Sequence, residues 1–300
     1  MPDFELSVTI CSWNTLAELE ECLCSLEAAL QETCFEVIVV DNNSEDGSPE
    51  MVERRFPWVR LYRMGQNLGF TGGHNFALAQ RHAASALLLN SDAAVRPGAL
   101  RALADFSRSR PDVGIVGPKL VNPDGSLQFS CRRFPNPTAA LFRNTPLGRM
   151  FPNNHFTRDY LMSDWPHDQP RDVDWVSGAA MFVSGEMMAR VGLMDPEYFM
   201  FCEDVDWCYR CHEAGLKVVY LPGAVVTHAI GRSTDKAPNR MIDRFHRSMF
   251  RFYRRNMLPK LPWPVRPFAY VGAASALTAR AALFIAKNRL DDWRRRHERS

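Results

Sequence analysis

Short apolar runs and longer amphipathic stretches alternate along roughly the first 120 residues of the chain. Five apolar runs predict buried β-strands, at residues 6–10, 35–40, 59–62, 86–89 and 113–116. Between the first two, apolar residues recur at helical spacing, at Leu19, Leu23, Leu26 and Leu30. Strands that alternate with helices are typical of an α/β protein built on a mostly parallel, doubly wound sheet.

Polar side chains stand at the ends of two of these strands. Asp41 closes the second strand, and Asn90 and Asp92 follow the fourth. In doubly wound sheets, ligands bind outside the carboxyl ends of the strands, so we expect these three residues to converge on one crevice. Each also has a plainer interpretation, because Asp41 can start an Asx-turn and Asp92 can cap the helix predicted at 97–107.

A glycine-rich stretch precedes the helix predicted at 70–81. Residues 67–75 read Asn-Leu-Gly-Phe-Thr-Gly-Gly-His-Asn, and a glycine-rich approach to a helix N-terminus suits phosphate. The stretch is neither a Walker A loop nor a G-x-G-x-x-G fingerprint. A turn followed by a cap therefore explains it equally well.

The acidic run Glu203, Asp204 and Asp206 opens another predicted helix, after the apolar residues 198–201. Carboxylates are stabilised as anions in the first turn of a helix, and one of them could accept a proton from a substrate. A charged helix start is the alternative. His228 follows a strand predicted at 217–221, where it could bind a metal ion together with Asp92 or be an ordinary edge histidine.

Charge divides the chain into two parts. The net charge is +2, but residues 1–235 hold 20 Lys and Arg against 30 Asp and Glu, whereas residues 236–300 hold 16 against 4. The basic part begins with a predicted amphipathic helix at 239–257, followed by a proline cluster at 259–267 and a last helix at 270–290. A basic helix beside an acidic body suggests an anionic neighbour, which is a membrane or a nucleic acid. The plainer interpretation is a solvated helix that packs on the body. Residues 119–172 show weak periodicity and predict irregular surface, with a mobile flap as one interpretation.

The first ten residues lack the basic and then apolar order of a signal peptide, so we expect a cytoplasmic protein with eight reduced cysteines. No uninterrupted apolar run reaches 18 residues, and the nearest, at 268–285, is broken by Arg280. The order C-x-x-C-H at 208–212 lies inside a predicted helix. We interpret it as ordinary semi-buried cysteines rather than as a haem or zinc site.

Seven motifs, in this order, resemble those of family 2 glycosyltransferases of the GT-A fold, and within them the rhamnosyltransferase-like branch. The resemblance covers roughly residues 5–235. The motifs are VTICSWN (8–14), VVDNNS (39–44), NLGFTGGHN (67–75), LLNSD (88–92), DWVSG (174–178), FMFCEDVD (199–206) and VVTH (225–228).

The resemblance implies a GT-A fold, with a mostly parallel, Rossmann-like central sheet flanked by helices. Residues 1–235 would be the catalytic domain, and residues 236–300 a basic, amphipathic helical extension. The implied activity is the inverting, metal-dependent transfer of a sugar from a nucleotide-diphosphate donor, with dTDP-rhamnose as the best match. The implied acceptor is a lipid-linked saccharide of envelope polysaccharide or O-antigen synthesis, at the inner face of the cytoplasmic membrane.

The implied partners are the donor, the acceptor and an anionic membrane surface that contacts the basic C-terminal region. No nucleic acid is expected, and an oligomer stays open. The alternative function is that of a non-catalytic, nucleotide-sugar-binding partner in an assembly complex.

Carried over residue by residue, the resemblance makes Asp204 the catalytic base and makes Asp92 and His228 ligands of a divalent cation, Mg²⁺ or Mn²⁺. It assigns the nucleotide to Cys11, Trp13, Asn14, Asp41, Asn43, Asn67, Gly69, Asn90 and Ser91. It assigns the donor or acceptor sugar to Asn75, Trp175, Gly178 and Glu203. Asn90 stands where the metal motif of the family begins with Asp, which leaves one carboxylate fewer for the metal.

Overall fold

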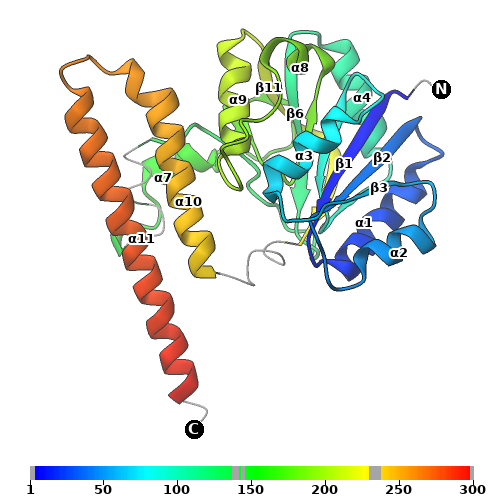
Figure 1. Ribbon diagram of the computed structural model, residues 1–300. Coiled ribbons are helices and arrows are strands. Elements are labelled where there is room, and N and C mark those ends of the chain that lie inside the picture. The colour runs from blue at the N-terminus through cyan, green and yellow to red at the C-terminus, as the bar shows by residue number, and fades with distance from the viewer. Residues whose placement is uncertain (1–3, 137–141, 143–145, 230–237, 298–300) are drawn as a thin grey trace.

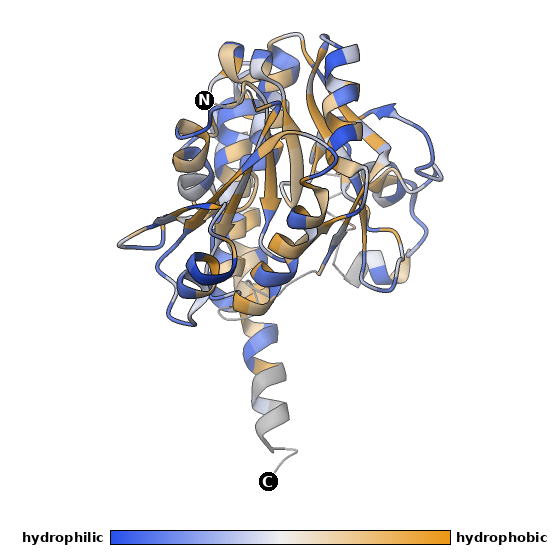
Figure 2. Cartoon of the chain, turned by 90° about the vertical axis from the view of Figure 1, so that its right-hand side faces the viewer, coloured by the Kyte–Doolittle hydropathy of each residue, from blue (hydrophilic) through white to orange (hydrophobic). Residues whose placement is uncertain are grey.

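A computed structural model describes residues 4–136, 142, 146–229 and 238–297 (Figure 1). The body is a nine-stranded sheet with helices on both faces, in the order β3-β2-β1-β4-β10-β6-β11-β5, and β8 pairs with β11. The strands that form the sheet are β1 (Leu6–Ser12), β2 (Phe35–Asp41), β3 (Arg60–Arg63), β4 (Ala86–Asn90), β5 (Ala93–Val95), β6 (Val113–Val121), β8 (Arg171–Asp172), β10 (Ala180–Val183) and β11 (Lys217–His228). Figure 2 shows that these strands are the hydrophobic centre of the molecule.

The mostly parallel sheet confirms the fold predicted from the sequence. Strands β1 to β4 are parallel to one another, and β6 is parallel to β11. The exception is β10, which runs antiparallel between β4 and β6. Apolar runs do not reveal strand direction, so the antiparallel insertion was not foreseen.

Two apolar cores lie on opposite faces of the sheet, because successive strand residues point to opposite sides. Leu87 and Leu89 of β4 belong to one core, and Ala86 and Leu88 belong to the other. The first face is covered by α1 (Leu16–Ala29), α2 (Ser48–Arg55) and α4 (Ala99–Ser109). The second is covered by α3 (Gly69–Ala79), α8 (Gly185–Val191) and α9 (Glu203–Glu213).

Residues 119–172 are more ordered than their weak periodicity predicts. β6 continues to Val121. The described part of the segment also holds β7 (Cys131–Arg132), α6 (Pro146–Met150), α7 (His155–Leu161) and β8. These elements have two to seven residues each, which is too short for a periodic signal. β7 pairs with β9 (Trp175–Val176) in a separate two-stranded sheet.

β11 is also longer than the predicted strand at 217–221, because it resumes after a register shift between Leu221 and Val225. The shift falls at Pro222 and Gly223, where a continuous strand pattern is lost. The second half of β11 brings His228 opposite Ala93, one residue beyond Asp92.

The C-terminal region is a pair of antiparallel helices packed against the body. α10 (Pro238–Phe252) continues into a π-helical turn, η1 (Tyr253–Met257), and a short 3₁₀ turn, η2 (Leu258–Lys260). α11 (Arg266–His297) then returns along α10, as the ring pairs Phe250–Tyr270 and His246–Phe284 show. The expected boundary between residues 235 and 236 lies outside the described residues.

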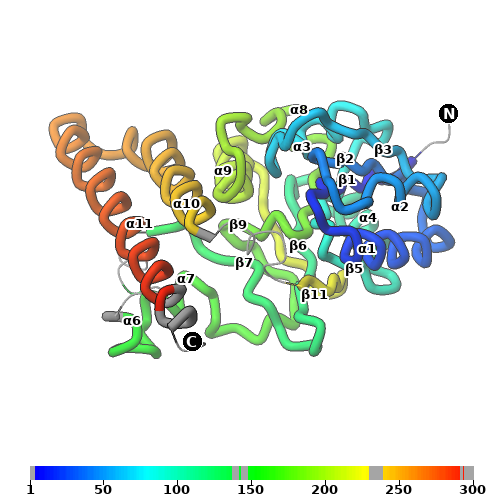
Figure 3. The backbone as a smooth tube through the Cα atoms, turned by 60° about the horizontal axis from the view of Figure 1, so that its bottom comes forward, coloured from blue at the N-terminus to red at the C-terminus, as the bar shows by residue number. Residues whose placement is uncertain are grey.

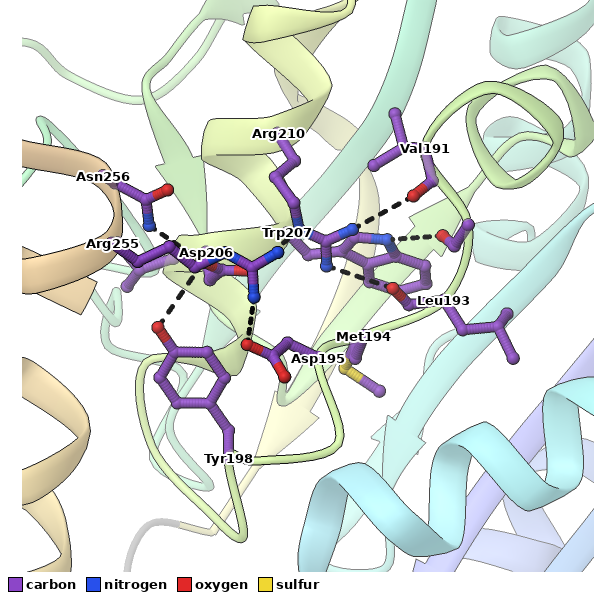
Figure 4. Close-up of polar contacts among 12 residues, drawn as sticks. Val191, Leu193, Met194, Asp195, Tyr198, Asp206, Trp207, Arg210, Arg255 and Asn256 are labelled. Atoms are coloured by element: carbon purple, nitrogen blue, oxygen red, sulfur yellow. Dashed lines mark hydrogen bonds and ion pairs between the residues drawn. The ribbon is translucent and has the colours of Figure 1, made fainter. Parts of the chain in front are cut away.

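A buried carboxylate joins α9 to this helical pair (Figure 4). Asp206 is fully buried, and its Oδ1 accepts a hydrogen bond of 2.9 Å from Asn256 Nδ2 in η1, while its Oδ2 pairs with Arg210 Nε at 2.8 Å. Arg210 also donates to the carbonyl oxygens of Val191 and Leu193. The Asp206 carboxylate and the Arg210 guanidinium thus both find hydrogen-bond partners inside the protein, as a buried charge requires.

A second contact fixes α10 to the loop before α9. Asp195 Oδ2 accepts hydrogen bonds from Arg251 Nη2 at 2.6 Å and from Arg255 Nη1. Burial alone would raise the pKa of Asp195, but these two cations and the Glu197 amide lower it below its ordinary value. The folded state therefore favours the ionised carboxylate, and this contribution to stability is lost as the pH falls through the lowered pKa.

Replacement of Asp206 tests this anchor. Asp206→Ala removes one member of a buried ion pair and should lower the free energy of unfolding by about 3–5 kcal/mol, because Arg210 keeps its charge without its partner. Asn256→Ala should cost about 1–3 kcal/mol through the lost hydrogen bond. Urea denaturation at pH 7, followed by circular dichroism, measures both values.

Asp243→Ala is the matched control, because the Asp243–Arg247 pair is solvent-exposed on α10 and should be worth less than about 1 kcal/mol. A loss at Asp206 no larger than the loss at Asp243 would contradict the anchoring role.

Candidate active site

A cavity of about 580 Å³ lies where the carboxyl ends of β1 and β4 meet the N-termini of α3 and α9. The sheet register places Cys11 beside Asn90 and Ser12 beside Asp41, so the predicted convergence at the strand ends is observed. The predicted site residues that line the cavity are Cys11, Trp13, Asn67, Gly69, Asn90, Ser91, Asp92, Gly178, Glu203, Asp204 and His228.

The other predicted site residues do not line this cavity. Asn14 and Asn43 shape the neighbouring loops, with φ angles of 53° and 64°. Asn75 exchanges two hydrogen bonds with the backbone of Met194, which is a structural role. Trp175 lies in the wall of a second cavity, on the other side of Glu203 and Asp204.

Asp41 is buried just behind the cavity. One of its oxygens, Oδ2, accepts a hydrogen bond of 3.0 Å from the Ser44 amide, as the turn interpretation predicts. The other, Oδ1, is buried without a hydrogen-bond partner among the described residues. A buried acceptor of this kind is costly unless a ligand or water satisfies it, so Asp41 keeps the capacity to bind a donor group.

Asn42, which the sequence analysis did not single out, holds the glycine-rich stretch in place. Its side-chain Nδ2 donates a hydrogen bond to the Gly69 carbonyl at 3.1 Å, and its Oδ1 accepts one from the Leu68 backbone N–H at 3.2 Å. Gly69 has a φ of 74°, and a Cβ added there would lie 2.3 Å from the carbonyl oxygen of Phe199. Only glycine therefore allows α3 to approach the segment that leads to Glu203 and Asp204.

Asp92 and His228 meet at one end of the cavity. His228 Nε2 lies 3.3 Å from Asp92 Oδ1 and 3.3 Å from Asn90 Nδ2. Within the described ranges, no group of three or more His, Cys, Asp or Glu residues could hold a metal ion. The protein offers one carboxylate and one imidazole here, and a cation bound to them would take its other ligands from phosphate and water, as Mg²⁺ usually does.

Gln128, also missed from the sequence, orients the histidine. Gln128 Nε2 donates to Asn122 Oδ1 at 2.7 Å and to the His228 carbonyl at 2.6 Å, so its Oε1 faces His228 Nδ1 at 3.1 Å. This oxygen accepts the Nδ1 proton, which leaves a lone pair on Nε2 directed toward Asp92. Asp92 Oδ1 and His228 Nε2 then face each other as two acceptors, and a cation fits between them. A hydrogen-bond acceptor on the other ring nitrogen, such as Gln128 Oε1, commonly orients metal-binding histidines.

Asp204 and Glu203 lie at the start of α9, at the boundary of the two cavities. Asp204 Oδ2 accepts from the Gly178 amide at 3.0 Å, and Oδ1 accepts from the Val205 amide at 2.8 Å. Burial raises the pKa of Asp204, although these amides and the nearby Arg132 oppose the shift.

The pKa of Glu203 is raised further, by burial and by the charge of Asp204. Neighbouring carboxyl groups resist ionising together, and the larger upward shift favours the proton on Glu203 over Asp204. The turn that presents them is strained, because Phe201 and Cys202 have φ angles of 72° and 64° although neither is glycine.

α10 contributes a wall that the sequence analysis did not predict. Arg240, Met241 and Arg244 line the cavity, and the Arg244 guanidinium stacks 3.9 Å from the ring centre of Phe199. Two arginines beside the strand ends add positive charge that favours an anionic ligand. The alternating arginines and apolar residues of 239–257 were the available signal, but they do not show which face packs on the body.

The cysteines of the C-x-x-C-H order are structural in their surroundings. Cys208 and Cys211 are free thiols in the buried face of α9. Burial raises the pKa of both, to about 12 for Cys211, so they stay neutral at physiological pH.

Comparison with known proteins identifies the family of this chain. The family described as glycosyltransferase like family 2 matches residues 2–254. An N-acetylglucosaminyl-diphospho-decaprenol L-rhamnosyltransferase of Mycobacterium tuberculosis is 33% identical over 262 residues, which cover 82% of this chain and 83% of that protein. The dTDP-rhamnosyl transferase RfbF of Shigella flexneri is 23% identical, with 75% of this chain and 69% of that protein covered.

Among solved structures, the mannosyltransferase PcManGT from Pyrobaculum calidifontis, in complex with GDP-Man and Mn²⁺, has a TM-score of 0.56 to this chain. The two are 18% identical, and the match covers 96% of this chain and 80% of that one. This likeness confirms the GT-A fold that the motifs implied. The protein is therefore a rhamnosyltransferase-like glycosyltransferase, and the chain belongs to glycosyltransferase family 2.

Proposed function

We propose that the protein is an inverting glycosyltransferase that transfers rhamnose from dTDP-rhamnose to a lipid-linked N-acetylglucosaminyl diphosphate. The observation that carries the proposal is that Asp204 and the Asp92–His228 pair line one cavity at the carboxyl ends of the strands. The relatives' names supply the candidate donor and acceptor, since one acts on N-acetylglucosaminyl-diphospho-decaprenol and another is a dTDP-rhamnosyl transferase.

In this mechanism, a hydroxyl of the acceptor attacks the anomeric carbon of the donor while the bond from that carbon to the diphosphate oxygen breaks. Asp204 accepts the hydroxyl proton as the new glycosidic bond forms. Attack from the face opposite the leaving group inverts the anomeric centre, as in inverting glycosidases with the acceptor in place of water. When bound at Asp92 and His228, a divalent cation supplies positive charge that offsets the charge developing on the diphosphate.

The remaining groups bind and orient the donor. The free oxygen of Asp41 is suited to accept a hydrogen bond from a base N–H or a ribose hydroxyl. Arg240 and Arg244 add positive charge near the diphosphate, and Trp13 offers an aromatic surface in the same wall. A non-catalytic nucleotide-sugar-binding protein, the alternative function, would bind the donor equally well but would need neither a buried base nor an oriented His228.

A donor screen tests the activity and its metal dependence. Purified protein with Mn²⁺ or Mg²⁺ should release nucleotide from dTDP-rhamnose in preference to UDP-glucose, UDP-N-acetylglucosamine and GDP-mannose, and a chelator should abolish the release. His228→Ala should raise the concentration of Mn²⁺ needed for half-maximal activity about 10- to 100-fold, as losses around metal sites commonly do.

The metal titration of a surface variant, His155→Ala, should match that of the wild type. An unchanged titration in His228→Ala would remove His228 from the metal ligands. Turnover of no donor with either metal, in the presence of a synthetic lipid-linked acceptor, would contradict the catalytic proposal.

Asp204→Asn tests the catalytic base. The amide cannot accept the proton, so kcat should fall about 10²- to 10⁴-fold while the dissociation constant of dTDP changes little. Because burial raises the pKa of Asp204, wild-type kcat/KM should fall on acidification through a pH above the ordinary value for Asp. Equal turnover in Asp204→Asn would place the base elsewhere.

We also propose that the C-terminal helices dock on an anionic membrane from the cytoplasmic side. α11 carries large exposed apolar side chains, such as Phe268, Val271 and Leu283, and arginines run along α10. The segment Arg266–Leu290 of α11 is long and apolar enough to cross a membrane by length and composition alone, and its most apolar window has a mean hydropathy of 1.5. A basic, amphipathic surface favours docking over spanning.

Vesicle sedimentation tests this docking. The full chain should sediment with phosphatidylglycerol vesicles more than with phosphatidylcholine vesicles, and alkaline carbonate should release it. The double variant Phe268→Glu and Leu283→Glu should weaken binding by at least about tenfold, because two buried side chains are lost from the interface. Leu30→Glu, on the body, should have no effect. Resistance to carbonate would contradict peripheral docking.

A further inference from the structure

The second cavity lies between the body and the C-terminal helices, and it shares Ser177, Phe201, Glu203 and Asp204 with the first. Its volume is about 250 Å³. It is enclosed by the β7–β9 region and the start of α9 on one side and by α10 and α11 on the other, which lie side by side in Figure 3. The two acidic residues therefore line both cavities.

Two arginines line this cavity from opposite elements. Arg132 of β7 lies over the Trp175 ring, 5.0 Å from its centre, and acts electrostatically on Asp204. Arg280 of α11 lies over the Phe284 ring at 5.6 Å. Burial lowers the pKa of Arg280, because the guanidinium is partly withdrawn from water. A cavity with two partly desolvated guanidinium groups is suited to a ligand with oxyanions.

Buried polar atoms without partners surround the same space. In the part of the chain that the structure describes, Arg132 Nε, Glu203 Oε2 and His246 Nε2 are buried and make no hydrogen bond. His246 Nδ1 donates to the Ile242 carbonyl at 2.7 Å, so its Nε2 is an acceptor that a sugar hydroxyl could satisfy. A buried polar group without a hydrogen bond is unfavourable, and three of them around one cavity indicate a polar ligand.

The opposite wall is apolar. Phe245 and Met249 of α10 and Leu277 of α11 line it, and Phe245 packs against Phe201 with ring centres 5.8 Å apart. Beyond this wall, α11 continues with exposed apolar side chains. The cavity thus combines cations and acceptors on one side with a hydrocarbon surface on the other, which matches an amphipathic ligand with a sugar, a diphosphate and a lipid chain.

We propose that this second cavity is the acceptor site, in which Arg132 and Arg280 bind the diphosphate of a lipid-linked glycosyl diphosphate and Glu203 and His246 bind its sugar. The inference rests on the proposed function and adds the location and chemical class of the acceptor. The acceptor hydroxyl reaches Asp204 from this side, and the donor occupies the larger cavity on the other side. The proton moves to Asp204, the hydroxyl oxygen bonds to the anomeric carbon, and the nucleoside diphosphate leaves with the electron pair of the broken bond.

Binding measurements with two synthetic acceptors test the proposal. One carries N-acetylglucosamine on an undecyl diphosphate, and the other is the neutral undecyl N-acetylglucosaminide. Isothermal titration calorimetry of the wild type should show at least about tenfold tighter binding of the diphosphate, because charge-assisted bonds to arginine are lost with the neutral compound. Arg132→Ala and Arg280→Ala should each remove most of this preference, and Arg132→Lys should retain part of it.

The controls separate acceptor binding from folding and from the donor site. Arg247→Ala, an exposed arginine on α10, should leave the preference unchanged. The dissociation constant of dTDP and the midpoint of urea unfolding should stay near wild type in the arginine variants. In turnover assays, KM for the acceptor should rise at least about tenfold in Arg132→Ala while KM for dTDP-rhamnose is unchanged.

The proposal is overturned if the wild type shows no preference for the diphosphate, or if Arg132→Ala and Arg280→Ala keep it. It is also overturned if UDP-N-acetylglucosamine, which has the diphosphate but no lipid, binds more tightly than the undecyl compound and loses affinity in the same variants. Failure of the proposed function would instead be seen in the donor screen, because the calorimetry requires no turnover.

Discussion

The carboxylate of Asp206, buried in the first turns of α9, determines how the C-terminal helices meet the catalytic body. Its partners come from α9 itself and from η1, about 50 residues further along the chain. Residues two apart on a helix point about 200° away from each other, so Asp206 faces the interior while Asp204 faces the cavities. One short acidic run thereby supplies both the proposed base and the anchor of the wall opposite it.

Several contacts hold the start of α9 in place. Asp204 is held by two backbone amides, and the preceding turn adopts two consecutive left-handed conformations at non-glycine residues. Backbone strain of this kind persists only where surrounding contacts determine the conformation. The Asp206 ion pair, the approach of Gly69 to Phe199 and the hydrogen bond from Ser248 of α10 to the Met200 carbonyl together provide those contacts.

The sequence predicted the parts of the site that depend on single strands. Apolar runs located β1, β2 and β4, and the rule for strand ends brought Asp41, Asn90 and Asp92 together. The sequence alone could not predict contacts that depend on packing between distant elements. Gln128 meets His228 across 100 residues, and neither side chain carries a local signal for that pair. The same limit hid the role of α10, because an amphipathic pattern shows which face is apolar but does not identify what covers it.

The acidic run shows the limit most clearly. Its three carboxylates were grouped as one functional cluster, yet Asp206 pairs internally with Arg210 and has no exposed surface. Helical periodicity separates Asp204 from Asp206 and places Arg210 one turn after Asp206, but only tertiary contacts reveal that this pair is buried and that Asn256 completes it. Trp175 shows the same limit. Its motif, DWVSG (174–178), indicated a functional region, but it did not show which of the two neighbouring cavities Trp175 lines.

The position of α10 has a thermodynamic consequence. Its arginines line the larger cavity, which is the proposed donor site, and the neighbouring helix α11 carries the exposed apolar surface. If the donor occupies this cavity as proposed, an interaction that shifts α10 against the body would change the affinity for the donor, and by linkage the donor would change the strength of that interaction by the same factor. With α11 docked on a membrane, as proposed, such an enzyme would couple its location to its substrate occupancy without a separate regulatory domain.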